Sequence, residues 1–156
     1  MDRHKNAATF KGEPVTFLGT ERRVGDTAPD FTLAAGDLSP VTLYESRGKT
    51  RVLLTVLSVD TSTCSRELVA FNKLVKELGK DVVVYVISRD LPFAQTRLCG
   101  SEGIENIKSI SAYKNTKFAT DYGILWEGPE LLGRTIFIID GDNKITYKQV
   151  VPEMSE

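Results

Sequence analysis

Residues 51–57 read Arg-Val-Leu-Leu-Thr-Val-Leu, and residues 82–87 read Val-Val-Val-Tyr-Val-Ile. Apolar runs of this length are typical of strands that are buried on both faces. Between the two runs, apolar residues recur at helical spacing and Gly79 suits a helix C-cap, which predicts a helix over 62–79. Two strands joined by one long helix indicate a parallel pair with a right-handed crossover.

The flanking sequence extends this β-α-β unit in both directions. Before it, we expect a short hairpin within 9–17, short strands at 31–33 and 41–43, and a helical turn at 44–48. After it, we expect a helix over 92–99, an edge strand at 108–111, a helix over 114–122, a loop at 124–134 and a hairpin of strands 135–140 and 144–151. This order predicts a single α/β domain over residues 1–156, with a thioredoxin-like mixed central sheet flanked by helices and a short N-terminal β-hairpin.

The composition is that of an ordinary soluble globular domain. Hydrophobic residues make up 41% of the 156 residues, charged residues 26%, and the net charge is −1. Neither a nucleic-acid partner nor a membrane is indicated, and the sequence shows no apolar span or signal peptide, so we expect a cytoplasmic protein. With Cys64, Cys99 and a single histidine, the chain offers no zinc-type ligand set, and we expect neither a metal nor a cofactor.

Cys64 is the candidate nucleophile because of its place between the first strand and the helix. Thr61 is a good N-cap, which puts Cys64 near the third helical position. Unpaired N–H groups and the helix dipole favour a thiolate there. The alternative interpretation is a small apolar core residue, and position alone does not decide between the two. The absence of a Cys-x-x-Cys motif argues that Cys64 does not work with a near-neighbour thiol.

Two longer motifs make the chain resemble a known family. They are Ser58-Val59-Asp60-Thr61-x-x-Cys64 and Ser88-x-Asp90-Leu91-Pro92-Phe93-Ala94-Gln95-x-Arg97-x-Cys99-Gly100, followed further on by Gly133-Arg134. Over about residues 8–151, the sequence resembles the thiol peroxidases, which are atypical two-cysteine peroxiredoxins.

The resemblance implies a peroxidase that reduces hydroperoxides, with a preference for alkyl and lipid-type substrates. Cys64 would be the peroxidatic thiol that becomes a sulfenic acid, and Cys99 the resolving thiol of an intramolecular disulfide that thioredoxin reduces. Arg134 would lie beside the sulfur and stabilise the thiolate, while the Thr61 hydroxyl would orient the peroxide. Family members are usually homodimers. Taken alone, Thr61 could be a plain N-cap, Arg134 a surface arginine and Cys99 a buried apolar thiol.

Two features depart from the family pattern. Leu57 stands where a proline is expected, and a further helix usually follows the last strand. The missing helix predicts an exposed apolar patch, an oligomer contact or lower stability. These departures leave an alternative function open, a redox sensor or partner-binding module without turnover. We also expect the two sulfurs of the reduced protein to be too far apart to bond, so that residues 62–67 and 92–100 must partly unwind.

Overall fold

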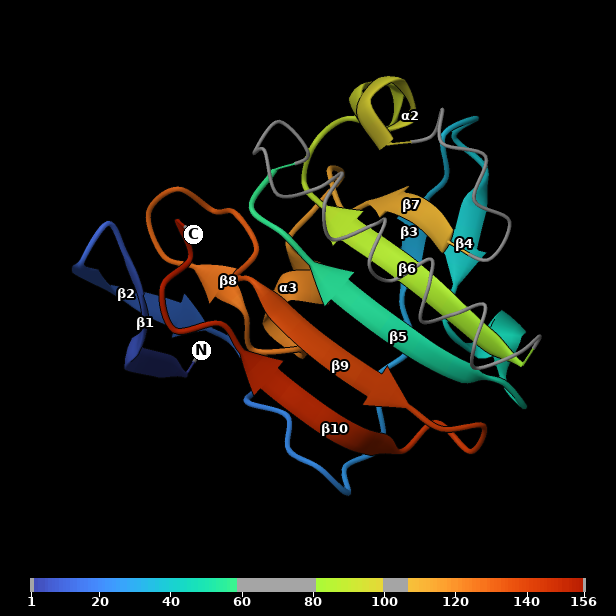
Figure 1. Cartoon of the computed structure of the whole chain (residues 1–156), viewed down its shortest axis with the longest axis horizontal. Helices are drawn as coiled ribbons and strands as arrows, with labels where there is room; N and C mark the ends of the chain where they lie inside the picture. The colour runs from blue at the N-terminus through green and yellow to red at the C-terminus, as the bar shows by residue number, and fades with distance from the viewer. Residues whose placement is uncertain (1, 59–80, 100–106, 156) are drawn as a thin grey trace.

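The computed structural model describes residues 2–58, 81–99 and 107–155, which form two β-sheets with short helices beside them (Figure 1). The larger sheet has seven strands in the order β10-β9-β5-β6-β7-β3-β4, and the smaller one has the order β1-β2-β8. The strands are β1 (Arg3–Phe10), β2 (Glu13–Leu18), β3 (Thr32–Ala34), β4 (Pro40–Thr42), β5 (Thr50–Thr55), β6 (Val82–Ser88), β7 (Ile107–Ser111), β8 (Leu125–Trp126), β9 (Thr135–Ile139) and β10 (Ile145–Val150). The helical elements are the 3-10 turn η1 (Tyr44–Ser46), α2 (Pro92–Cys99) and α3 (Lys117–Asp121).

The centre of the large sheet confirms the predicted parallel pair. β5 and β6 run parallel, from Thr50 opposite Val82 to Thr55 opposite Ile87, and β7 continues the parallel set beside β6. β9 adds to β5 in the antiparallel direction and pairs with β10 as the predicted hairpin. The sheet is therefore mixed, which confirms the α/β class. The predicted helix 62–79 lies outside the described residues.

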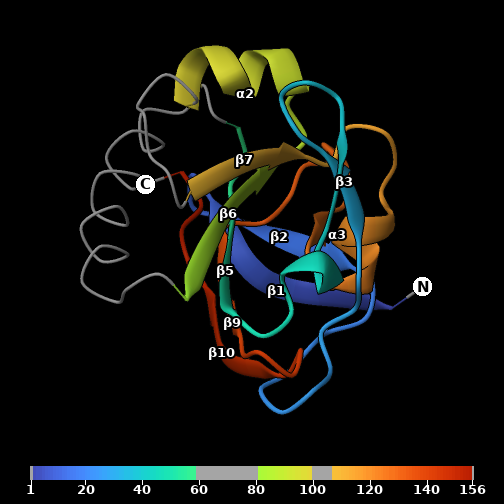
Figure 2. The same cartoon turned by 90° about the vertical axis from the view of Figure 1, so that its right-hand side faces the viewer.

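Three predictions about the flanking segments were wrong in part. β7 is not an edge strand, because β3 pairs with it through Ala34 and Ser111. The predicted loop 124–134 contains β8, a strand of two residues that pairs with β2. α3 is shorter than the predicted helix over 114–122, and it lies beside the large sheet in Figure 2. β8 and α3 are too short for hydrophobic periodicity to resolve, and the inner place of β7 depends on a pairing with β3 that its own sequence does not show.

The N-terminal hairpin is confirmed, and it is longer than predicted. β1 pairs with β2 from Arg3 opposite Leu18 to Phe10 opposite Glu13, and β8 completes the small sheet through Phe17 and Trp126. The hairpin lies beside the C-terminal segment in Figure 1, where the main chains of Thr9 and the C-terminal segment exchange two hydrogen bonds. The two ends of the chain therefore support the same side of the fold.

A cluster of aromatic rings fills the core between the large sheet and α3. Phe31 packs edge-on against Phe118, with ring centroids 5.2 Å apart, and Tyr122 packs against Phe137 at 5.4 Å. Phe118 and Tyr122 are buried, as expected for packing residues, and the Tyr122 hydroxyl donates to a backbone carbonyl. Phe93 differs, because 62% of its side chain is exposed at the start of α2. It therefore does not contribute to the core.

Candidate active site

One edge of the large sheet gathers the segments that carry the predicted site. Thr55, the last residue of β5, lies opposite Ile87 of β6 and opposite Thr135, the first residue of β9. The carboxyl ends of β5 and β6 therefore meet the start of β9. This is the edge of an open α/β sheet at which ligands generally bind. The chain continues from here past Ser58 towards Cys64, and α2 begins at the same edge with Pro92.

Arg134 is buried at this edge, directly before β9. Only 8% of the residue is exposed, which excludes the alternative of a surface arginine. Its Nη1 donates a hydrogen bond of 3.3 Å to the carbonyl of Met154, and its own carbonyl accepts from the N–H of Val151. The guanidinium of arginine is a positively charged, planar set of N–H donors. The fold thus places a fixed positive charge at the carboxyl end of β5.

The backbone on either side of Arg134 is held by a pair of buried threonines. The Thr55 hydroxyl donates to the Gly133 carbonyl at 2.6 Å and lies 2.6 Å from the Thr135 hydroxyl. The Thr135 N–H in turn donates to the Thr55 hydroxyl at 3.1 Å. The ring of Phe17 also packs closely against Gly133, where a Cβ would lie 2.9 Å from Cε2 of Phe17 and closer still to Cζ. These contacts leave the main chain at Arg134 little freedom.

The acceptor for Arg134 belongs to a C-terminal segment that is tied to the N-terminal hairpin. Met154 is buried, and its N–H donates to the Thr9 carbonyl at 2.8 Å. The Glu153 carboxylate accepts hydrogen bonds from the N–H and hydroxyl of Ser155, from the Gly12 N–H and from the Thr9 hydroxyl. These bonds, above all those from Ser155, lower the pKa of Glu153 from 4.5 to about 2. The segment is thus an ordered support for the Arg134 side chain.

The remaining predicted residues fall at or beyond the limits of the described chain. Cys64 and Thr61 lie outside the described residues. Cys99 is the last residue of α2, which confirms that it lies on a short helix following Pro92. Leu57, the residue in place of the family proline, packs its buried side chain into the main core cluster. The fold therefore brings Arg134 and the start of α2 to one sheet edge, and the distance between the two sulfurs remains a prediction.

Sequence reasoning gave no role to a set of polar side chains at this edge. The Asp90 carboxylate accepts hydrogen bonds from the hydroxyls of Ser58, at 2.8 Å, and Ser88, at 2.6 Å. Both serines follow or end buried strands. The available signal was the recurrence of Ser and Asp directly after two apolar runs, at Ser58-x-Asp60 and Ser88-x-Asp90.

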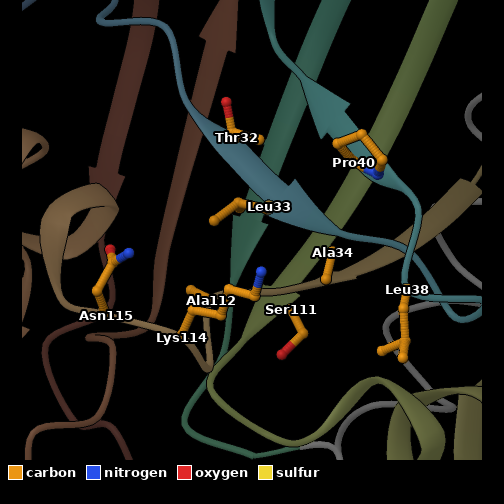
Figure 3. A pocket seen from close by; sticks show the side chains of 9 residues that line it. All are labelled: Thr32, Leu33, Ala34, Leu38, Pro40, Ser111, Ala112, Lys114 and Asn115. Carbon is orange, nitrogen blue, oxygen red and sulfur yellow. The ribbon is translucent and has the colours of Figure 1, made fainter.

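A pocket of about 250 Å³ lies where β3 and β7 diverge. In the strand order of the large sheet, this is on the far side of β5 and β6 from β9, the strand that follows Arg134. Figure 3 shows Leu33 and Ala34 of β3 facing Ser111 and Ala112, with Leu38 at one end. The two strands pair only through Ala34 and Ser111, which leaves the space open. Since β5, β6 and β7 lie between this pocket and β9, it does not include Arg134.

Two further observations concern the described part of the chain. No three histidine, cysteine, aspartate or glutamate side chains converge there in a way that could hold a metal ion. None of the helices described is both long enough and apolar enough to cross a lipid bilayer.

Comparison with known proteins agrees with this fold. The Redoxin family model matches residues 23–156. A thiol peroxidase from Oceanobacillus iheyensis is 43% identical over 147 residues, covering 94% of this chain and 89% of that protein. Among solved structures, a peroxiredoxin-like protein from Aquifex aeolicus has a TM-score of 0.87 at 36% identity, with 98% of this chain and 91% of that chain covered. A thiol peroxidase from Chromobacterium violaceum, at 21% identity, shares the fold with a TM-score of 0.84 over 98% of this chain and 89% of that chain.

The fold class is therefore the thioredoxin-like fold of the peroxiredoxins, as predicted. The chain belongs to the Redoxin family and, within it, to the thiol peroxidases. This confirms the predicted class of enzyme, a thiol-dependent peroxidase.

Proposed function

We propose that this thiol peroxidase reduces hydroperoxides through Cys64, with Cys99 as the resolving thiol. The Cys64 thiolate attacks the O–O bond, the distal oxygen becomes the sulfenic acid, and an alcohol or water leaves. The Cys99 thiol then condenses with the sulfenic acid, releasing one water and forming the disulfide. A thioredoxin-type dithiol returns both cysteines to thiols and is itself oxidised to a disulfide. Alkyl and lipid-type hydroperoxides are the proposed substrates, together with hydrogen peroxide.

The observation that carries this proposal is the buried Arg134 at the carboxyl end of β5. A thiolate is the form of cysteine that attacks a peroxide, and a nearby guanidinium favours it over the thiol. Arg134 also offers several N–H donors in a fixed plane, which suit the two oxygens of a peroxide. With Thr61 as a further hydrogen-bonding group, the site would stabilise charge as it develops on the leaving oxygen.

Helix α2 gives the resolving step its proposed geometry. Cys99 ends this helix, so a disulfide with Cys64 requires the two Cα atoms to come within about 7 Å of each other. We propose that in the reduced protein the two Cα atoms lie further apart than this, with the sulfurs too far apart to bond, and that residues 62–67 and 92–100 partly unwind to close the distance. Resolution would then be a conformational step that follows peroxide attack.

The proposal includes a homodimer in the cytoplasm, with thioredoxin as the reducing partner. Leu91 and Phe93 at the start of α2 are exposed apolar residues beside the proposed site, which supports a protein contact there. Sedimentation equilibrium of the reduced protein tests the dimer. A monomer at micromolar concentration would remove this part of the proposal.

Hydroperoxide turnover tests the proposed chemistry directly. Cumene hydroperoxide is supplied with thioredoxin, thioredoxin reductase and NADPH, and NADPH oxidation is followed. We expect turnover by the wild type, no turnover by Cys64→Ser, and reduced turnover by Cys99→Ser. Unchanged turnover in Cys64→Ser would contradict the proposal. Oxidation once per molecule without turnover would instead favour the redox sensor.

A further inference from the structure

A single carboxylate joins the ends of two neighbouring strands at the proposed site. Oδ1 of Asp90 accepts from the Ser58 hydroxyl at 2.8 Å, and Oδ2 accepts from the Ser88 hydroxyl at 2.6 Å. Hydrogen bonds to an ionised acceptor are stronger than those between neutral groups. Asp90 therefore connects the chain that follows β5 to the end of β6. It lies two residues before Pro92, where α2 begins.

The same polar set holds α2 against β6 and β7. Gln95, of which 1% is exposed, donates through Nε2 to the Ser88 hydroxyl and to the Ile110 carbonyl, both at 2.9 Å. The Ser111 hydroxyl donates to the main-chain carbonyl of Asp90. One side chain within the helix and one residue just before it are thus bound to the strand ends, which fixes the direction in which the helix leaves the sheet.

A helix as short as α2 depends on such contacts. It has eight residues, and isolated helices of that length do not persist in water. Leu91 and Phe93 at its start are exposed, so they add little packing. Among the residues that the structure describes, Gln95 Oε1 has no hydrogen-bond partner, and a buried unpaired oxygen weakens the docked arrangement. Among residues 92–95, the part of α2 whose side chains the structure describes, the attachment thus rests in part on the polar contacts of Gln95 and is incomplete at its Oε1 atom.

We propose that Asp90 is a positioning residue for the resolving step, an inference that rests on the proposed function. Its hydrogen bonds hold α2, and with it Cys99, in the arrangement of the reduced protein. Because Cys99 must leave that arrangement to reach the Cys64 sulfenic acid, the bonds to Asp90 oppose disulfide formation. They do not oppose peroxide attack, which precedes it. Asp90 thereby sets the lifetime of the sulfenic acid.

A single-turnover experiment separates the two steps. Reduced Asp90→Ala is mixed with one equivalent of cumene hydroperoxide and quenched at intervals, and sulfenic acid, trapped by dimedone, and disulfide are counted by mass spectrometry. We expect the second-order rate of peroxide consumption to stay within about twofold of wild type. The first-order rate of disulfide formation should rise roughly tenfold, the factor that corresponds to 1.4 kcal/mol. A disulfide rate that is unchanged or slower would overturn the proposal.

Two variants and one physical measurement complete the test. Asp81→Ala removes a carboxylate just before β6, at the opposite end of the strand, and should leave both rates at the wild-type values. Ser58→Ala removes the hydrogen bond to Asp90 Oδ1 and should raise the disulfide rate by roughly threefold, even if Asp90→Ala does not fold. Hydrogen exchange of the amides of residues 94–98 in the reduced protein should be about tenfold faster in Asp90→Ala than in Asp81→Ala. Equal exchange in the two variants would overturn the proposal.

The outcomes distinguish this inference from the function on which it rests. A wild type that consumes peroxide but forms no Cys64–Cys99 disulfide contradicts the proposed function, and the role of Asp90 falls with it. A wild type that forms the disulfide, together with an Asp90→Ala variant that forms it at the same rate, overturns the role of Asp90 alone.

Discussion

The Thr55 hydroxyl donates a hydrogen bond of 2.6 Å to the Gly133 carbonyl, joining residues 78 positions apart in the sequence. This bond fixes the main chain one residue before Arg134, at the end of β5 from which the chain continues towards Cys64. The guanidinium that the proposed chemistry needs is therefore positioned by a buried threonine on a strand from a different part of the chain. A substitution at residue 133 therefore tests how closely this part of the site is packed.

Gly133→Ala should destabilise the protein, because the new Cβ meets the ring of buried Phe17. Overpacking of this kind costs about 1–3 kcal/mol in the free energy of unfolding, which urea denaturation measures. In the double variant with Phe17→Leu, we expect part of that loss to be recovered, as a coupling between the two substitutions. Strictly additive effects would show that the ring does not limit the space at Gly133.

Arg134→Lys should lower kcat/KM for an organic hydroperoxide by roughly 100-fold or more. Lysine keeps the charge and loses the planar set of donors, and removal of one preorganised donor commonly costs that factor. The measurement is peroxide consumption under the thioredoxin assay conditions. Arg89→Lys is the matched control, since Arg89 lies at the same sheet edge and donates only to backbone carbonyls among the bonds found for it. Equal losses in both variants would argue against a specific role for Arg134.

Much of this fold follows from hydrophobic pattern, and the parts that do not have identifiable causes. The runs at 51–57 and 82–87 predicted β5 and β6 because strands buried on both faces must be continuously apolar. β8 was missed because Leu125–Trp126 is too short to show alternation, and it becomes a strand only through pairing with Phe17 and Leu18. β7 is an inner strand only because β3, which lies about 75 residues earlier in the chain, pairs with it.

The candidate site was also predictable from the sequence only in part. The motif around Cys99 predicted a short helix after Pro92, because proline suits a first helical turn, and α2 confirms it. The burial of Arg134 was not predictable from its neighbours, since its acceptor on Met154 arrives from 20 residues further on. The polar set around Asp90 likewise joins three strand ends, which no local pattern connects.

The C-terminal segment should lose stability in acid through Glu153. Its folded-state pKa is lowered from 4.5 to about 2 by hydrogen bonds, chiefly those from Ser155. A lowered pKa means that the stabilisation is complete above about pH 4.5 and is lost as the pH falls towards 2. We therefore expect the Tm difference between wild type and Glu153→Gln to be constant from pH 7 to pH 5 and to vanish near pH 2.

The exposed Glu13, on the hairpin to which the C-terminal segment is bound, supplies the control for this measurement. Glu13→Gln should show no comparable change of its Tm difference over the same range. A Glu153→Gln variant whose Tm difference from wild type stays constant down to pH 2 would contradict the role of its hydrogen bonds.

Arg51→Lys should destabilise the fold by about 2–3 kcal/mol, because it leaves buried acceptors unpaired. Arg51 is fully buried, and its guanidinium donates to the carbonyls of Leu43 and Asp140 and to the Asn143 side chain at 2.6–2.8 Å. Burial lowers the pKa of Arg51, although the group stays charged at neutral pH. Chemical denaturation against the exposed control Arg47→Lys measures the effect, and equal stabilities would refute the assignment.

The proposed catalysis depends on a thiolate at Cys64 that Arg134 stabilises. The direct measurement is the pH dependence of alkylation at Cys64 in a Cys99→Ser background, with and without the further substitution Arg134→Gln. We predict a midpoint well below the value of about 8.5 for free cysteine, and a midpoint at least one pH unit higher once Arg134 is replaced. A midpoint at or above about 8.5, unaffected by Arg134→Gln, would show that Arg134 does not stabilise a thiolate at Cys64.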